Sequence, residues 1–335
     1  MSAAPWPVIG HNGAIRTLRQ MILADRFPPA ILITGVPGSG RLTLARTFVA
    51  AALCEHAAVG DPCLTCDQCR HVLAGTCPDV SEFSLARQEI ERGANKSGTL
   101  TIETARAISS ASSLLPRDAS RRFVIIDDAD TFAETAQQAL LKTLEDVPGY
   151  LTFILIATHS AALLETILSR CVVVPLQLVA TSDIAASLSG PDAAEIARLA
   201  NGRPGWALTA QKQPAVLQLE RERISAIERW IAGNERERLV IAYQRGEQFQ
   251  RERAEILADL DTVHIIWRDL LFARIGATDL MIDRDRPTRL LARATIEPLS
   301  MLQAVGATER CSQDLQRNVR PRLALQSMVN QWPTL

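Results

Sequence analysis

The first half of the chain alternates short, continuous apolar runs with longer segments whose apolar residues recur at helical spacing. The clearest apolar runs are residues 31–33, 123–126, 151–157 and 172–174. A strand that is buried on both faces has such a continuous run, and these strands occur in parallel sheets covered by helices. We therefore predict an α/β fold for about the first 175 residues, with helices on both faces of a parallel sheet.

Between these runs the apolar positions predict the covering helices and one further strand. The predicted helices are residues 14–24, 44–54, 101–115, 134–146 and 161–168. A short strand is predicted at residues 79–85, and the polar segment 87–98 is predicted as a loop. Pro148 and Gly149 end the fourth of these helices.

The pattern changes after Pro175. Residues 180–200 predict one or two short helices, and from residue 216 to the end the spacing is helical nearly everywhere. Charge-rich stretches in this part, such as residues 220–223, lie opposite apolar residues and are typical of solvated helix faces. Because no residue pattern here carries chemistry, we predict a packing role, within the chain or against partners.

Composition narrows the class of protein. The chain has 335 residues and a net charge of −1, so two or three domains are expected and there is no overall basic field for nucleic acid. No apolar run reaches the roughly 18 residues that a membrane span needs. The N-terminal sequence MSAAPWPVIG lacks a basic region followed by an apolar core. We expect a soluble, cytoplasmic protein.

A glycine-rich loop follows the first apolar run. Gly35, Gly38 and Gly40 lie in the sequence GVPGSG, which leads directly into a helix. Backbone N–H groups of such a loop converge on an anion at the positive end of the helix, and the spacing Gly35-x-x-x-x-Gly40 fits a P-loop.

The residues after this loop depart from a working P-loop. Such a loop has Lys for the β- and γ-phosphates and then Ser or Thr for Mg²⁺, whereas this chain has Arg41 and Leu42. Arg41 is a planar fork where a compact ammonium is needed, and Leu42 has no oxygen. Thr43 is one residue too late, rotated by about 100° around the helix. The loop is suited to phosphate but lacks the residues for hydrolysis.

Four of the seven cysteines fall within sixteen residues, at Cys54, Cys63, Cys66 and Cys69. This spacing, among turn-forming residues, fits the all-sulfur tetrahedral site of structural Zn²⁺. The rival candidates for the fourth ligand are Cys77, His56 and His71. We prefer Cys54 because it ends the helix that follows the P-loop; buried free cysteines are the alternative.

Acidic residues follow the apolar run at residues 123–126. Asp127 and Asp128 lie where a Walker B strand places an acid for the Mg²⁺ shell and then, usually, a Glu that orients the attacking water. Asp128 is one methylene shorter than that Glu. On spacing alone, acids that only cap the next helix are an equal alternative.

Several motifs together resemble a known family. They are VIGHNGAI, GVPGSG, the four cysteines, VIIDDAD, QQALLKTLEDVP, ATHSAALLETILSRC and NVRPRLALQ. This combination, which covers the whole chain, resembles the bacterial DNA polymerase III clamp-loader AAA+ subunits, and among them it is most similar to the delta-prime group. The resemblance implies an AAA+ domain at residues 1–176 with a zinc knuckle at 54–69, a helical lid at 177–212 and a helical collar at 213–335.

The resemblance also implies roles for single residues. Arg170 in the sequence SRC matches the arginine finger, which reaches the γ-phosphate in a neighbouring subunit. Without the family, an ordinary salt bridge is the favoured interpretation of Arg170. Thr158 matches the first nucleotide sensor and Arg203 the second, while Cys54, Cys63, Cys66 and Cys69 match the zinc ligands. The implied partners are the tau/gamma and delta subunits in a five-membered ring, with the sliding clamp and primed DNA.

Three departures from a motor subunit agree with one another: Arg41, Leu42 and Asp128. They predict a subunit that does not hydrolyse ATP, leaves ATP or ADP binding in doubt, and supplies Arg170 to a neighbour during clamp loading. The first alternative is an active tau/gamma-like ATPase that uses Arg41 and Thr43. The second is a scaffold protein with neither activity.

Overall fold

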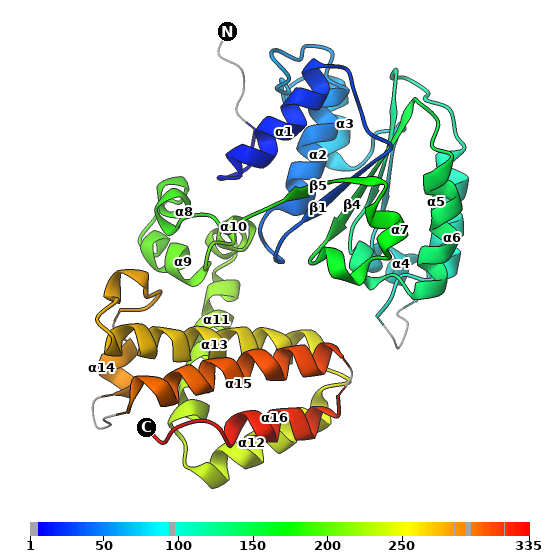
Figure 1. Cartoon of the computed structure of the whole chain (residues 1–335). Helices are drawn as coiled ribbons and strands as arrows, with labels where there is room; N and C mark the ends of the chain where they lie inside the picture. Colours follow the sequence, from blue (N-terminus) through cyan, green and yellow to red (C-terminus); the bar gives the residue numbers. More distant parts are fainter. Residues whose placement is uncertain (1–5, 94–97, 285, 292–295, 318) are drawn as a thin grey trace. The chain divides into compact units, whose positions relative to one another are not determined.

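The computed structural model describes residues 6–93, 98–284, 286–291, 296–317 and 319–335 (Figure 1). The chain divides into two compact units, Met1–Leu208 and Thr209–Leu335. Of the motifs quoted above, the first residue of NVRPRLALQ, Asn318, lies outside the described residues. None of the described helices combines the length and apolar character that a membrane crossing requires.

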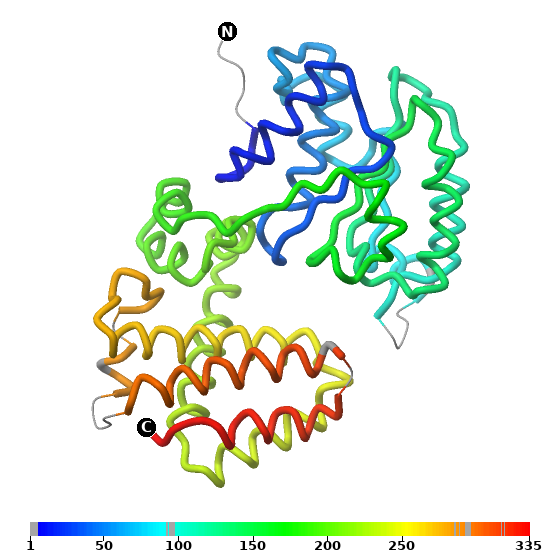
Figure 2. The backbone as a smooth tube through the Cα atoms, in the orientation of Figure 1, coloured from blue at the N-terminus to red at the C-terminus, as the bar shows by residue number. Residues whose placement is uncertain are grey.

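A five-stranded parallel sheet forms the centre of the first unit, with the strand order β2-β3-β4-β1-β5. The strands are β1 (Ala30–Thr34), β2 (Val80–Phe83), β3 (Arg122–Ile126), β4 (Leu151–Ala157) and β5 (Cys171–Pro175). β1 lies between β4 and β5, so segments far apart in sequence run side by side (Figure 2). Thr34 is level with Ala157 and Pro175, and the carboxyl ends of these three strands meet at one edge of the sheet.

Helices cover both faces of this sheet (Figure 1). They are α1 (Asn12–Leu23), α2 (Arg41–Ala52) and α3 (Asp67–Ala74) on one face, and α5 (Ile102–Ser112) and α6 (Glu134–Glu145) on the other. Successive strand residues point to opposite faces. Ile31 therefore packs in the cluster of Phe48, and Leu32 packs in the cluster of Leu140. The apolar runs are buried on both sides, as the sequence pattern predicted.

A short helix, α4 (Leu85–Arg92), occupies part of the segment that the sequence analysis predicted as a loop. That prediction was wrong for residues 87–92, and residues 94–97 lie outside the described residues. The helix begins because Ser84 accepts the N–H of Arg87 and Asp128 accepts the N–H of Leu85. The second acceptor comes from a residue distant in sequence, so local spacing did not reveal it.

Short elements complete the first unit. They are η1 (Ala129–Thr131), η2 (Ser160–Ala162), α7 (Glu165–Leu168), α8 (Thr181–Ser187), α9 (Ala193–Leu199) and the first part of α10 (Pro204–Lys212). The boundary between the two compact units falls inside α10. The division into a sheet domain, a lid at residues 177–212 and a collar stays a prediction.

Every described element of the second unit is a helix. The helices are α11 (Pro214–Ala232), α12 (Glu235–Gln248), α13 (Arg253–Arg274), η3 (Thr278–Leu280), α14 (Arg286–Leu290), α15 (Pro298–Gln316) and α16 (Pro321–Val329). Trp332 packs against Trp230 and Trp267, with ring centroids 5.1 and 5.9 Å apart. Such aromatic pairs add to the stability that burial of their area supplies.

A buried ion pair fixes the middle of the second unit. The guanidinium of Arg286 donates to Asp269 at 2.7 Å, and both side chains are almost fully buried. Asp269 also accepts the backbone N–H groups of Ile282 and Asp283 at 3.2 and 3.0 Å. Because all of these groups are paired, the chain after α13 is held against that helix.

Candidate functional site

The glycine-rich loop joins β1 to α2 at the carboxyl edge of the sheet. Gly38 and Gly40 have φ values of 81° and 97°, a region that residues with a side chain rarely adopt. Gly40 is the N-cap of α2, and no side chain caps that helix start. The segment is therefore a glycine-dependent turn between a strand and a helix, which is the strand–loop–helix order that the sequence pattern predicted.

Arg41 is bound within its own chain. Its Nη1 atom donates a hydrogen bond to the hydroxyl of Thr158 at 3.2 Å, so the P-loop cation position is linked to the end of β4. Leu42 packs against the core of the first unit. Thr43 is exposed. The structure brings Arg41 and the predicted sensor Thr158 together and leaves Thr43 outside the pair.

A second contact reaches the loop from α10. The backbone N–H groups of Gly205 and Trp206 donate to the carbonyl oxygen of Gly38 at 2.7 and 3.3 Å. The approach is close, because a Cβ added at Gly205 would lie 2.8 Å from that oxygen. His11 Nε2 also donates to the carbonyl oxygen of Ser39 at 2.8 Å. The first turn of α10 therefore lies directly on the loop.

Arg203 is also near this contact, and two hydrogen bonds of its side chain go to the end of α9. Its Nε donates to the carbonyl oxygen of Ala200 at 2.8 Å and its Nη2 to that of Leu199 at 3.3 Å. The guanidinium lies over the ring of Trp206, 5.6 Å from its centroid. A cation at the carboxyl end of a helix is favourable because the last carbonyl groups carry partial negative charge. These contacts give Arg203 a structural role at the end of α9.

The acids after β3 face in different directions. Oδ1 of Asp127 accepts the backbone N–H of Asp128 at 2.9 Å. Burial, followed by the charge of Asp128, raises the pKa of Asp127. Asp128 has a φ of 56°, and its Oδ2 accepts the N–H of Leu85 at the start of α4, 3.3 Å away. The side chain of Asp128 therefore binds the start of α4, a helix that precedes it in the chain. The alternative in the sequence analysis was a cap on the helix that follows, and Asp128 makes no side-chain cap hydrogen bond there.

Two polar residues that the sequence analysis did not single out organise this edge of the sheet. Asp130 accepts the backbone N–H of Thr158 at 2.8 Å. The side chain of Gln137 donates to the carbonyl oxygen of Ala162 at 3.0 Å and accepts the N–H of Leu164 at 2.9 Å. Asp130 was visible as the last acid of VIIDDAD. Gln137 is the first residue of the motif QQALLKTLEDVP, but nothing in that motif indicated its partners after β4.

Arg170 lies just before β5, at the amino edge of the sheet. A parallel strand of five residues is about 16 Å long, so β5 separates Arg170 from the loop at the carboxyl edge. Its Nη1 donates to the carbonyl oxygen of Thr166 at 2.7 Å, and its Nη2 donates to Oε1 of Glu145 at 2.9 Å. The side chain is 35% exposed. Arg170 therefore belongs to a surface remote from its own glycine-rich loop.

The four predicted metal ligands form one cluster. The Sγ atoms of Cys54, Cys63, Cys66 and Cys69 all lie within 4.8 Å of one another. Cys54 follows α2, and Cys69 lies in α3, which packs on α2. Cys77 is elsewhere, because its thiol contacts Gln68. The structure thus supports Cys54 as the fourth member, ahead of Cys77, His56 and His71.

Backbone donors prepare this cluster for a metal. The N–H of Cys63 points to Sγ of Cys54 at 3.3 Å, and the N–H of Cys66 points to Sγ of Cys63 at 3.2 Å. Hydrogen bonds from Thr65 and Cys66 lower the pKa of the Cys63 thiol to about 5. Burial raises the pKa of the Cys69 thiol. Burial also raises the pKa of the Cys54 thiol, so Cys63 is the member whose thiolate the hydrogen bonds favour. Four sulfurs within reach of one ion fit Zn²⁺, which binds deprotonated thiols.

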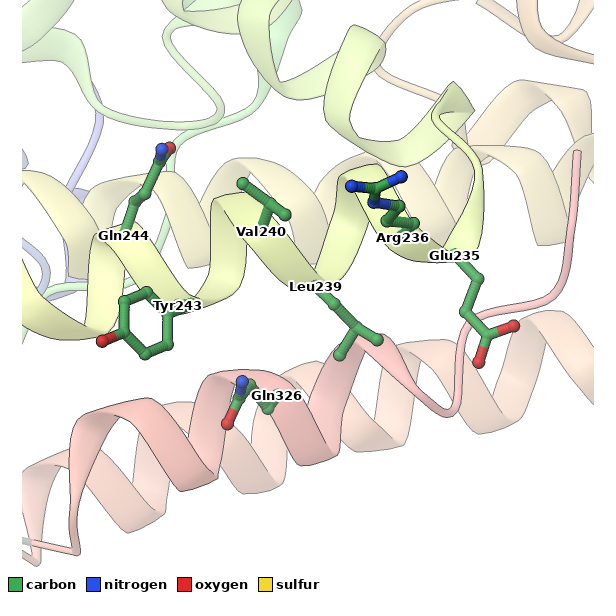
Figure 3. Close-up of a pocket in the computed structure, with 7 residues that line it drawn as sticks. All are labelled: Glu235, Arg236, Leu239, Val240, Tyr243, Gln244 and Gln326. Atoms are coloured by element: carbon green, nitrogen blue, oxygen red, sulfur yellow. The ribbon is translucent and has the colours of Figure 1, made fainter.

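A groove in the second unit is lined by none of the predicted site residues. It has a volume of about 580 Å³ and follows α12, where Leu239, Val240 and Tyr243 supply its apolar lining and Gln326 of α16 faces it (Figure 3). Glu235 and Arg236 lie at one end (Figure 3). Its residues form no phosphate-binding or metal-binding arrangement, so the candidate site is placed in the first unit.

Comparisons with solved structures give low similarity scores. A DNA polymerase III gamma subunit-related protein from Thermotoga maritima is 21% identical, with a TM-score of 0.44 over 95% of this chain and 97% of that one. A RuvB variant from the same organism is 18% identical, with a TM-score of 0.40 over 61% of each chain. The description of the fold therefore rests on the strands and helices of this chain.

Comparisons of sequence give the family. The subunit tau of Bacillus subtilis is 32% identical over 164 residues, and the subunit gamma of Buchnera aphidicola from Acyrthosiphon pisum is 28% identical over 177 residues. These alignments cover 49% and 53% of this chain but only 27% and 46% of the two DNA polymerase III relatives. The profile of the family described as "DNA polymerase III, delta subunit" matches residues 10–180, just over half of the chain. The chain therefore belongs to this family of bacterial clamp-loader AAA+ proteins.

Proposed function

We propose that this chain is a delta-prime-like subunit of a DNA polymerase III clamp loader and that it does not hydrolyse ATP itself. In this role it supplies Arg170 to the nucleotide site of a neighbouring motor subunit while the sliding clamp is loaded onto primed DNA. Family membership supports the clamp-loader part of the proposal. The bonding of Arg41 to Thr158 is the observation that carries the non-hydrolysing part.

Groups of the glycine-rich loop already form hydrogen bonds within the chain. Arg41 takes the place of the P-loop Lys but donates to Thr158, and the carbonyl oxygen of Gly38 accepts two N–H groups from the first turn of α10. Leu42 offers no ligand for Mg²⁺, and Asp128 caps α4. Hydrolysis needs a Mg²⁺ ligand and a residue that orients water, and this loop has neither in place. These contacts support a subunit without turnover of its own.

Arg170 supports the second part of the proposal. It is exposed at the edge of the sheet opposite its own loop, so a nucleotide that it touches must belong to another chain. A guanidinium suits that task because its planar fork can pair with phosphate oxygens and neutralise the charge that develops during transfer. The proposed partners are tau/gamma and delta subunits in a five-membered ring.

The metal and the helical regions have structural roles in this proposal. Zn²⁺ bound by Cys54, Cys63, Cys66 and Cys69 ties the end of α2 to α3 and leaves no open ligand position for catalysis. Residues 177–212 act as the lid, and residues 213–335 act as the collar through which the subunits assemble. The lid proposal is supported by the contact of Gly205 and Trp206 with Gly38.

The test is ATP turnover by the assembled loader with clamp and primed DNA. Arg170→Ala should lower turnover because one neighbouring site loses its finger, while gel filtration should show an intact assembly. Arg87→Ala is the matched control, since Arg87 is also an exposed arginine in an ion pair. Unchanged turnover with Arg170→Ala would rule out the finger.

The chain alone provides the complementary measurement. At saturating Mg-ATP it should show no turnover above background. Clear turnover by the isolated chain that Arg41→Ala abolishes would instead favour an active ATPase with a variant P-loop. The exposed position of Thr43, away from the Arg41 and Thr158 pair, argues against that alternative.

A further inference from the structure

The carboxylate of Glu145 is the one acidic partner of Arg170 among the described residues. Glu145 is the last residue of α6, and its Oε1 accepts a hydrogen bond from Nη2 of Arg170 at 2.9 Å. Glu145 is 52% exposed and Arg170 is 35% exposed. The pair joins two elements that are 25 residues apart in sequence. No motif of the sequence analysis assigned a role to Glu145.

The contacts of Arg170 use one side of its guanidinium. Nη1 donates to the carbonyl oxygen of Thr166 at 2.7 Å and to the hydroxyl of Ser169 at 3.4 Å. Nη2 donates to Glu145. A guanidinium has five N–H donors, so the Nε hydrogen and the second Nη2 hydrogen have no acceptor among the described residues. Nε and Nη2 are neighbouring nitrogens of the guanidinium plane, and their remaining hydrogens are donors that a phosphate can use.

We propose that Glu145 is a positioning residue for Arg170. It fixes the guanidinium from behind so that the edge formed by Nε and Nη2 faces outward, toward the phosphate of a nucleotide held by a neighbouring subunit. This inference rests on the proposed function, because it assigns Glu145 a task in the same reaction in trans.

The solvent exposure of the Arg170–Glu145 pair favours a positioning role over a contribution to folding stability. An exposed ion pair contributes little to the free energy of folding, because water screens the charges and two flexible side chains must be ordered. A long arginine that is already ordered loses less conformational freedom when it binds phosphate. The carboxylate of Glu145 and the carbonyl of Thr166 together restrict the rotation of the guanidinium. A small misplacement of a charged group at a reacting phosphate has a large effect on rate.

The test uses the complete loader with clamp and primed DNA, measured over a range of ATP concentrations. The contribution of Arg170 to kcat is the difference between the unaltered loader and the Arg170→Ala loader. Glu145→Ala should lower this contribution by about three- to tenfold. The KM for ATP should stay unchanged, since the neighbour's loop binds the nucleotide. Glu145→Gln keeps the oxygen that accepts the hydrogen bond and should restore part of this loss. Asp146→Ala, which removes the adjacent exposed carboxylate, should leave kcat unchanged.

A double variant separates the possible outcomes. Glu145→Ala combined with Arg170→Ala should have the same turnover as Arg170→Ala alone, because a positioning residue has no effect without its target. If Glu145→Ala lowers kcat equally in both backgrounds, or raises it, the positioning role is wrong. The same conclusion follows if Arg170→Ala lowers turnover and Glu145→Ala does not. If Arg170→Ala has no effect, the proposed function itself fails.

Discussion

Arg41 and Arg170 lie at opposite edges of the same parallel sheet, and their surroundings differ. Arg41 follows the glycine-rich loop at the carboxyl edge and donates to Thr158. Arg170 precedes β5 at the amino edge, is 35% exposed and keeps N–H donors without an acceptor among the described residues. Both residues were predicted from sequence as cations of a nucleotide site, Arg41 in its own loop and Arg170 in that of a neighbour. Arg41 is bonded within the chain, whereas Arg170 keeps donors that a partner can use.

This difference teaches that a phosphate-binding motif is best judged by the partners its groups already have. At the carboxyl edge, Gly38, Arg41 and Asp128 each have a hydrogen-bond partner within the chain. A ligand that entered there would have to replace those bonds, and breaking a bond without replacing it is costly. At the amino edge, a phosphate could bind Arg170 without displacing any described contact.

Removal of the metal should give the largest effect on stability, and it tests the surroundings of Arg41. α2 begins at Arg41, and the cysteine cluster follows its other end. A ligand at about 1,000 times its Kd stabilises a protein by about 4 kcal/mol, so chelation of Zn²⁺ under reducing conditions should lower the thermal midpoint of unfolding markedly. The measurement is calorimetry with metal analysis, and one Zn²⁺ per chain is expected. Protein that is purified in reduced form without zinc, yet unfolds at the same temperature, would contradict the site.

A smaller effect is expected from Gly205→Ala, which tests the contact that closes the loop. The added Cβ would lie 2.8 Å from the carbonyl oxygen of Gly38, and such overpacking costs about 1–3 kcal/mol. Denaturant unfolding measures this cost. Gly149→Ala is the matched control, because no atom lies within 4 Å of its added Cβ. Equal stability of the two variants would mean that α10 is not held on the loop.

The smallest effect is expected from restoring the P-loop residues with the double change Arg41→Lys and Leu42→Thr. Turnover by the isolated chain should stay at background, because Asp128 still caps α4 and Gly205 still contacts Gly38. The change in stability should be about 1–2 kcal/mol, because the hydrogen bond of Arg41 and part of the apolar packing of Leu42 are lost. A coupled ATPase assay is sufficient. Clear turnover would show that residues 41 and 42 alone prevent hydrolysis, and that the contacts of Gly38 and Asp128 do not.

The strands of the sheet were predictable from sequence, because strands buried on both faces have continuous apolar runs, and all five predicted strands are present. The strand order was not predicted. The cysteine cluster was equally predictable, since ligand spacing is local. Cys54 joins Cys63, Cys66 and Cys69, as its place at the end of a helix suggested.

Contacts between distant residues were not predictable. Thr158 is 117 residues from Arg41, and no periodicity in sequence records their hydrogen bond. The role of Asp128 depended on α4, whose polar sequence looked like a loop. Arg203 was predicted as a nucleotide sensor, but its hydrogen bonds to Ala200 and Leu199 appear only once α9 has been placed. Spacing therefore indicated the residues, and three-dimensional packing decided their partners.

The position of Trp206 gives this chain an intrinsic optical reporter. Only five tryptophans are present, and three of them, Trp230, Trp267 and Trp332, pack in the second unit. Trp6 is buried and bonded to Asp61, while the half-buried Trp206 lies on the glycine-rich loop. Indole fluorescence shifts to longer wavelength when the ring becomes hydrated. In a variant whose other four tryptophans are replaced, a shift of the Trp206 emission would therefore report opening of the loop, without an added dye or nucleotide.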